Sequence, residues 1–310
     1  MINIFLFSFL SSIYLLCSGL IFFKKDIREK NEIFLHIFFG AISISFIALI
    51  ANFFISLNQT FNTVILIFIL IFGSIIIIKK QIVYKSIIAC SLIALISTLI
   101  LTFDTIYRPD GSMYHLPYTK ILNDNKIIFG ISNIHFRFGH TSILQYLNAI
   151  FNNHIFEIKG IITPAATIFS SLVLYFYYDI NKNLDKDKIY TYFIFLILAY
   201  ILYGYNRYSE FGNDTIAHLY FLLISSFLLK KNFKEKFNFD VLINISFLSI
   251  FCFMLKSSLI LILTIPLLLL LINFRKEYLV NLKSLTLILI TFLWFIKNLI
   301  TSGCFIYPIG

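Results

Sequence analysis

Charged residues are scarce in this chain: they make up only 13% of its 310 residues, about half the share of a soluble domain. Aliphatic, aromatic and sulfur-containing residues make up 59%. Such a chain has too little polar surface to enclose one water-soluble core. The composition therefore excludes a soluble globular protein and indicates that lipid is the solvent.

Cysteine is also rare, with only 4 residues. Cys17, Cys90 and Cys252 fall inside apolar runs, and Cys304 stands alone. Neither a disulfide framework nor a CxxC metal site is therefore predicted.

What the chain does contain is a series of Ile- and Phe-rich runs, each close to the length that crosses a hydrocarbon layer as a helix. The first run has no basic residue before it and is followed by Lys24 and Lys25, the reverse of the charge order of a signal peptide. We therefore predict an all-α, polytopic transmembrane helical bundle with about ten spans, forming a single transmembrane domain over residues 1–310. The predicted spans are 2–23, 33–56, 62–78, 86–103, 158–178, 189–205, 215–229, 241–255, 258–273 and 279–296.

The net charge of +10 would suit nucleic acid, but the lysines lie in short clusters between apolar runs rather than on one basic face. Alternate connections carry these clusters, and the other connections are poor in lysine. The positive-inside rule assigns the lysine-rich set to the cytoplasm and both termini to the outside. We expect the inner (cytoplasmic) membrane of a bacterium, with membrane lipids and no nucleic acid as partners. The lysine-rich set contains Lys24, Lys25, Arg28, Lys30, Lys79, Lys80, Lys85, Lys182, Lys186, Lys188, Lys230, Lys231, Lys234, Lys236, Arg275, Lys276 and Lys283.

The N-terminal spans occupy residues 1–85, the remaining spans lie in 158–310, and a polar external loop at residues 104–157 follows the fourth span. Two short amphipathic helices are predicted in it, one capped by Ser112 and one beginning near Thr141. We expect both to lie flat in the membrane interface. The chain stops within another external segment, which leaves open whether it is incomplete at its C-terminus.

Asp110 is the first candidate for catalysis. Pro109 and the Asp110-Gly111 pair favour a turn just before the Ser112 helix, so that Arg108 and a positive helix end would both favour an ionised carboxylate. Such a carboxylate, just outside the lipid, can serve as a general base. Helix capping alone is the structural alternative. Asp214, at the start of the seventh span, has the same two interpretations. If both acids take part in catalysis, one would act as the base and the other would bind a metal ion or a sugar hydroxyl.

Three of the five arginines, Arg108, Arg137 and Arg207, fall in external loops, where positive charge is otherwise avoided. The planar guanidinium binds phosphate, so a polyprenyl-phosphate headgroup would explain their position, as would ordinary phospholipid anchoring. His115 and His135 lie in the external loop without a compact metal-ligand spacing, which favours hydrogen bonding and leaves a divalent metal open.

Several motifs together resemble the GT-C superfamily of integral-membrane glycosyltransferases, in particular bacterial envelope members. They are an acidic residue in a large external loop, Tyr114-His115-Leu116, the Gly-Ile-Ser-Asn-Ile-His-Phe-Arg-Phe-Gly run at 130–139, and Lys297-Asn298 with Gly303 near the C-terminus. Lys297 stands where that family has arginine, and Cys304-Phe305 where it has Asn-Pro. The likeness covers about residues 86–310.

The resemblance implies inverting transfer of a sugar from a polyprenyl-phosphate donor to an envelope glycan or lipid acceptor at the outer face. Asp110 would act as base, Asp214 would assist, and the arginines and Lys297 would hold the phosphate. The alternative is a transporter or flippase of lipid-linked saccharides, or a polymerase of them. Because the prolines Pro164 and Pro266 are isolated and the charges gather at one face, the sequence favours interfacial chemistry over a pathway through the bilayer. The substrate-binding residues expected are Arg108, Tyr114, His115, His135, Arg137, Arg207, Glu210, Lys297 and Asn298.

Overall fold

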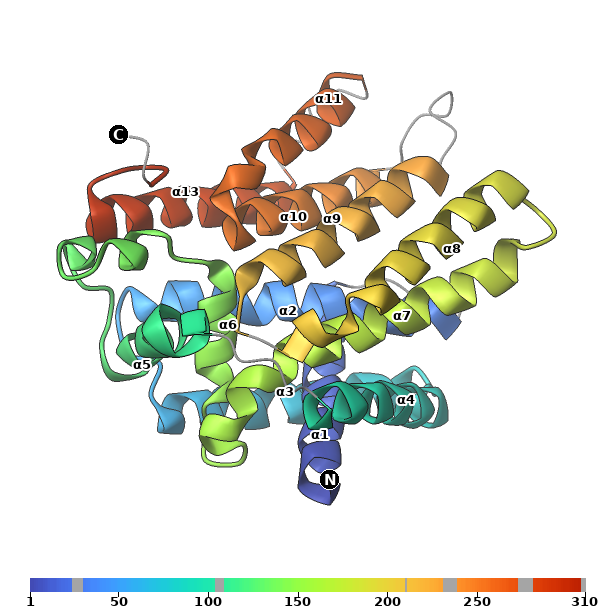
Figure 1. The fold of residues 1–310 in the computed structure, drawn as a ribbon, viewed down its shortest axis with the longest axis horizontal. Coiled ribbons are helices and arrows are strands. Elements are labelled where there is room, and N and C mark those ends of the chain that lie inside the picture. Colours follow the sequence, from blue (N-terminus) through green and yellow to red (C-terminus); the bar gives the residue numbers. More distant parts are fainter. Residues whose placement is uncertain (24–29, 104–108, 210, 231–238, 273–280, 308–310) are drawn as a thin grey trace.

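The computed structural model describes residues 1–23, 30–103, 109–209, 211–230, 239–272 and 281–307 (Figure 1). Within these ranges the chain is helical and has no β-strand, so the predicted all-α class is confirmed. A helix lies at each of the ten predicted spans. These helices are α1 (Ile2–Phe22), α2 (Lys30–Asn52), α3 (Gln59–Lys79), α4 (Val83–Thr102), α7 (Thr163–Asn183), α8 (Lys188–Tyr203), α9 (Asn213–Lys230), α10 (Phe239–Leu255), the 3-10 turn η6 (Ser257–Leu263) with α11 (Thr264–Ile272), and α13 (Leu282–Ser302).

Six of the described helices are long and apolar enough to cross a membrane. The others are shorter or more polar: α8 has 16 residues and α10 has 17. At about 1.5 Å per residue, a helix of this length falls short of a hydrocarbon layer about 30 Å thick. The chain is thus a helical protein with six apolar helices suited to a membrane, and the count of ten spans stays a prediction. The six are Ile2–Phe22, Asn31–Asn52, Gln59–Lys79, Val83–Thr102, Glu157–Asn183 and Leu282–Ser302.

Helix α1 packs against α2, α3 and α4, and two glycines set its distance from α2. A Cβ atom at Gly19 would lie 1.9 Å from the His36 carbonyl oxygen, and one at Gly40 would lie 1.8 Å from that of Leu15. Because neither glycine has a side chain, the two helix backbones come into direct contact, as small residues allow in membrane helices.

Buried hydroxyl groups join α7 to three neighbouring helices. Such bonds between helices replace water as the partner of a polar side chain inside an apolar bundle. The contacts are Ser11 Oγ to Thr167 Oγ1 at 3.0 Å, Ser97 Oγ to Ser170 Oγ at 2.9 Å, and Ser171 Oγ donating to the Phe34 carbonyl at 2.8 Å.

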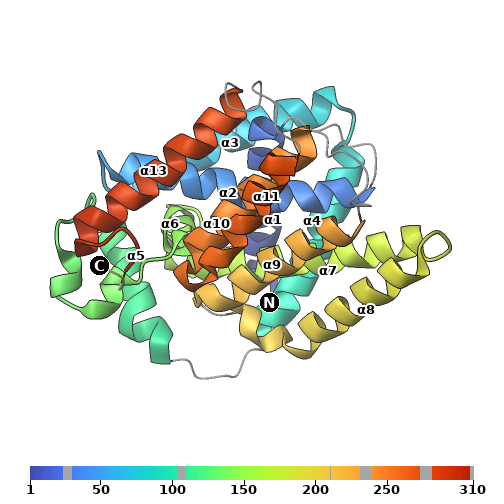
Figure 2. The same cartoon turned by 90° about the horizontal axis from the view of Figure 1, so that it is seen from above.

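The lysine-poor connections meet around the external loop, at the side where α5, the end of α13 and the C-terminal label lie in Figures 1 and 2. Four contacts join the loop to the other members of this set. Leu57 N–H donates to the Leu122 carbonyl at 2.9 Å, Gly130 N–H donates to Ile300 at 2.9 Å, Ser142 Oγ donates to Leu255 at 2.8 Å, and the Phe211 ring packs on Gly111.

Lysine-rich helix ends also meet one another. Fully buried Asp179, near the end of α7, accepts from Lys230 at the end of α9 and from the Tyr190 hydroxyl of α8. Lys283 and Asp240, near the starts of α13 and α10, form an ion pair of 2.9 Å. The division of the connections into two sets thus corresponds to two groups of contacts in space.

The described part of the external loop contains five short helices rather than two, and a sixth, η4, begins at its last residue. Ser112 does not cap the first of them, because the chain is already helical at Pro109 and the Ser112 hydroxyl donates to the Pro109 carbonyl at 3.1 Å. That part of the prediction is wrong. The helices are η1 (Gly111–His115), α5 (Leu116–Asp124), η2 (Ile131–Asn133), η3 (Phe136–Gly139), α6 (Ile143–Phe151) and η4 (Glu157–Ile162).

The second predicted helix is α6, which begins with a capping box between Ser142 and Gln145. All nine of its residues are buried, so α6 lies inside the protein, and its position relative to the membrane interface stays a prediction. Its last turn is held by other elements: the Asn123 amide of α5 donates to the Ala149 carbonyl at 3.0 Å, and Asn62 of α3 donates to the same carbonyl at 2.8 Å. Carbonyls in the last turn of a helix lack the usual donor within the helix, and these bonds supply donors from outside it.

Candidate functional site

Asp110 lies in helical conformation immediately before the π-helix η1, not in the predicted turn. The phenol of Tyr114, four residues further along, lies in electrostatic range of this carboxylate. Burial, and then the Asp110 carboxylate, raise the pKa of Tyr114 to about 12, so the phenol remains a donor at neutral pH. Asp110 is exposed, and Arg108 lies outside the described residues. Single π-helical turns are frequent at functional sites.

Gly111 is needed for close packing rather than for a turn. A Cβ atom here would lie 3.0 Å from the ring of Phe211, which precedes α9. The Asn213 amide donates to the Leu255 carbonyl at 2.7 Å and holds the start of α9 beside the end of α10. Phe211 on Gly111 therefore brings the first turn of α9, with Asp214, next to Asp110.

His115 lies buried behind the two acids, both of which act on it electrostatically. Burial lowers the pKa of His115 to about 4, although the carboxylates of Asp110 and Asp214 act in the opposite direction. The ring is therefore neutral at pH 7. The Gln145 side-chain amide, whose oxygen accepts from Ser142 N–H, lies 3.4 Å from Nδ1 of His115. This contact makes Nδ1 the acceptor and leaves the ring proton on Nε2.

This buried histidine predicts a loss of stability in mild acid. Because its pKa is lower in the folded than in the unfolded chain, the unfolded chain binds more protons as the pH falls through the normal range of histidine. Between about pH 7 and pH 5 the loss amounts to about 2 kcal/mol in the free energy of unfolding. Unfolding in detergent is the measurement, and His115→Gln is expected to reduce the pH dependence. An unchanged dependence in the variant would contradict the assignment.

Arg137 approaches Asp110 from the other side of the external loop, on η3. Its guanidinium lies 5.3 Å from the ring centroid of Tyr114 and 5.2 Å from that of Phe136. His135 caps η3, because its Nδ1 accepts from Arg137 N–H at 3.2 Å. Among the described residues no carboxylate forms an ion pair with this exposed guanidinium, so its charge is available to an anion.

Asp214 lies in the first turn of α9 and forms an ion pair of 2.7 Å with Lys256, which precedes η6. One turn further, the exposed side chain of His218 lies in electrostatic range of Asp214, Lys256 and Arg207. Asp214 therefore takes part in a group of charged side chains in addition to its place at the helix start. Arg207, on the 3-10 helix η5 (Tyr205–Ser209), belongs to the same group. Glu210 lies outside the described residues.

Lys297 is fully buried in α13, not at the membrane surface. Its ammonium group donates to the Thr141 hydroxyl and lies 3.7 Å from the ring centroid of Trp294. Its neighbour Asn298 donates to the Phe305 carbonyl at 2.9 Å and holds the chain after α13. Tyr307 of that chain packs against Gly139 and the ring of His140. Lys297 and Asn298 thus connect α13 and the chain after it to the part of the external loop that carries Arg137. They do not lie at the part that carries Asp110.

Apart from the fully buried Lys297, the described site has three basic side chains, Arg137, Arg207 and Lys256, against two acidic ones, Asp110 and Asp214. One of the three is paired with Asp214, which leaves Arg137 and Arg207 against Asp110, an excess of positive charge suited to an anionic ligand. No group of three or more metal-ligating side chains occurs among the described residues. The carboxylates of Asp110 and Asp214 are the groups that a divalent cation would use.

Lys256 is a residue of the site that the sequence analysis did not identify. Its signal was present, because it is a lysine in a lysine-poor connection. The sequence analysis also did not identify Phe211, Gln145 and Thr141 as parts of the site, because no local pattern marks them.

The family model described as "Domain of unknown function (DUF8201)" matches residues 1–310. No curated protein and no solved structure matches the chain.

Proposed function

We propose the function from the site itself, because the chain belongs to the DUF8201 family, whose description assigns no activity. The protein is a membrane glycosyltransferase that moves a sugar from a polyprenyl-phosphate donor to an acceptor hydroxyl of an envelope glycan or lipid. We place its site at the outer face of a bacterial inner membrane. The likeness of the external-loop motifs to the GT-C superfamily supports the choice of reaction.

The observation that carries the proposal is the convergence of Asp110, Arg137 and Asp214 around His115. Asp110 immediately precedes η1, Arg137 lies on η3 and Asp214 on α9, and all three act electrostatically on His115 although their sequence separations are large. A carboxylate next to unpaired guanidinium charge combines a proton acceptor with an anion-binding group. Transfer from a sugar phosphate requires both.

In this reaction the Asp110 carboxylate accepts the proton of the acceptor hydroxyl. The acceptor oxygen forms a bond to the anomeric carbon from the face opposite the phosphate, while the bond from that carbon to the phosphate oxygen breaks. The electron pair leaves with polyprenyl phosphate, and the configuration inverts. Arg137 binds the charge that develops on the phosphate, which is where electrostatic stabilisation contributes most.

The remaining residues position these groups. The Tyr114 phenol lies beside Asp110, and the Nε2–H of neutral His115 is a donor for substrate. Lys297 binds the Thr141 hydroxyl and packs on the Trp294 ring, and so fixes α13 against the external loop. Asp214, held by Lys256, is the second acid and binds a sugar hydroxyl or a metal ion.

The experiment is to supply membranes that contain the protein with polyprenyl-phosphate sugars labelled in the sugar. We expect the label to move to an acceptor. Movement of intact donor across the membrane, without transfer, would support a flippase instead. Addition of repeated units to one chain would support a polymerase that uses the same donor.

The orientation is tested with single cysteines in a background that carries Cys304→Ser. A membrane-impermeant maleimide applied to intact cells is expected to label Asn125→Cys, in the external loop, and not Lys186→Cys, between α7 and α8. Both side chains are exposed, so accessibility in the folded protein is comparable. Labelling of residue 186 alone would place the site on the cytoplasmic side and contradict the proposal.

A further inference from the structure

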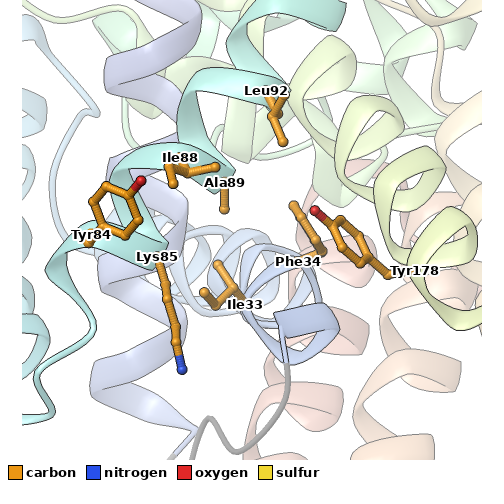
Figure 3. A pocket seen from close by; sticks show the side chains of 8 residues that line it. All are labelled: Ile33, Phe34, Tyr84, Lys85, Ile88, Ala89, Leu92 and Tyr178. Carbon is orange, nitrogen blue, oxygen red and sulfur yellow. The ribbon is translucent and has the colours of Figure 1, made fainter. Parts of the chain in front are cut away.

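A cavity of about 210 Å³ lies at the lysine-rich end of the bundle, away from the candidate site. It opens between the start of α2, the start of α4 and the end of α7 (Figure 3). Helix α4 contributes Lys85, Ile88, Ala89 and Leu92, which lie on one face at the spacing of successive helical turns. The wall is thus a continuous stripe of one helix.

The cavity is polar at one end and apolar at the other. In Figure 3 the ammonium group of Lys85 lies at one end and Leu92 at the opposite end. The backbone positions of these two residues are about 10 Å apart along the helix axis, at 1.5 Å per residue. Phe34 and Tyr178, whose ring centroids lie 5.5 Å apart, form the facing wall. The Tyr178 hydroxyl is the polar group on that side.

Lys85 is exposed, and within the described ranges no carboxylate forms an ion pair with it. Its charge is therefore available to an anion at the mouth of the cavity. Other lysines at this end of the bundle add positive potential: Lys79, Lys80, Lys182, Lys186 and Lys188. Basic pockets between membrane helices attract anionic headgroups.

The size of the cavity limits its occupant. A volume of about 210 Å³ is below the range of roughly 300–1,000 Å³ that holds a drug-sized molecule, so a bulky ring system does not fit. A narrow apolar channel with one cation at its mouth suits a single acyl chain attached to a phosphate. Because the lining is mainly apolar, a free phosphate would leave most of it unoccupied.

We propose that this cavity binds one anionic phospholipid, with its phosphate on Lys85 and the upper part of one acyl chain along Ala89 and Leu92. The lipid would fill the gap between α2, α4 and α7 and hold these helices together. The inference does not depend on the proposed transferase activity, because the cavity and the candidate site share no residue.

The test is a lipid titration of the full chain, purified in detergent, by native mass spectrometry. The probes are phosphatidylglycerol and phosphatidylcholine with identical acyl chains. We expect one phosphatidylglycerol to bind more tightly than any phosphatidylcholine. Lys85→Gln is expected to weaken this binding about fivefold, the effect of losing one lysine near an anionic headgroup. The matched control, Lys186→Gln, removes an exposed lysine at the same end that does not line the cavity and is expected to weaken binding far less than Lys85→Gln does.

A second variant tests the acyl-chain part. Ala89→Phe fills the cavity and is expected to abolish tight binding of phosphatidylglycerol while Lys85 is intact. If that variant does not fold, the comparison of Lys85→Gln with Lys186→Gln still decides. Equal loss in both lysine variants would mean diffuse charge attraction and would overturn the proposal. Full displacement of phosphatidylglycerol by an equal concentration of glycerol phosphate would identify a soluble phosphate ligand and would also overturn it.

Discussion

Asp110→Asn is expected to abolish transfer of labelled sugar while the protein still inserts and accumulates in the membrane. The amide keeps the size of the side chain, but it cannot accept a proton from the acceptor. Loss of a general base typically costs about 10²–10⁴-fold in rate. The measurement is transfer from labelled polyprenyl-phosphate sugar, normalised to the amount of protein in the membrane.

Asp124→Asn is the matched control for this variant. Asp124 lies in the same external loop, is half exposed and forms an ion pair of 2.9 Å with Lys120 at the end of α5, away from the convergent charges. It has the same chemistry as Asp110 and is expected to tolerate the substitution. Normal transfer by Asp110→Asn would contradict the assignment of Asp110 as the base. Equal loss of transfer in both variants would indicate damage to the external loop instead.

Gly40→Ala is expected to have the largest effect on stability. The added Cβ atom would meet the Leu15 carbonyl oxygen at 1.8 Å, and this oxygen belongs to a helix backbone that cannot rotate away. Helices α1 and α2 must therefore separate along their contact. Overpacking of a core costs about 1–3 kcal/mol, and we expect more here because backbone must move. The measurement is the midpoint of thermal unfolding in detergent and the yield of monodisperse protein.

Gly204→Ala provides the comparison. Gly204 follows α8, and the nearest atoms to its Cβ position are backbone oxygens at 3.9 Å, an ordinary contact distance. The same chemical change is therefore expected to leave the midpoint nearly unchanged. A Gly40→Ala protein as stable as Gly204→Ala would show that α1 and α2 are further apart than described.

Local sequence predicted the helices well because hydropathy and capping are local properties. The capping box at Ser142 and Gln145 lies within one residue of the predicted start of that helix. Burial of α6 was not predictable in the same way. Its polar residues look suited to water, yet the helix is enclosed by others, and Asn62 and Asn123 from two of them donate to its Ala149 carbonyl.

The candidate site shows the same limit. Asp110 and Asp214 were identified from residue type and position, since acids are rare in this chain and these two follow apolar runs at the same side. That they meet depends on Phe211 packing against Gly111, a contact between segments about 100 residues apart. Lys297 was expected at the surface and is buried, because α13 packs its polar side onto the external loop through Thr141.

By itself, the sequence determined that this chain is helical and that several of its helices are long and apolar enough to cross a membrane. Scarcity of charge and run length carry this information along the chain. Only the tertiary structure decided which polar side chains meet: the Asp214–Lys256 pair, neutral His115 behind two acids, and α6 enclosed by asparagine amides. The physical reason is that contacts between helices depend on how whole faces pack, and no single segment encodes them.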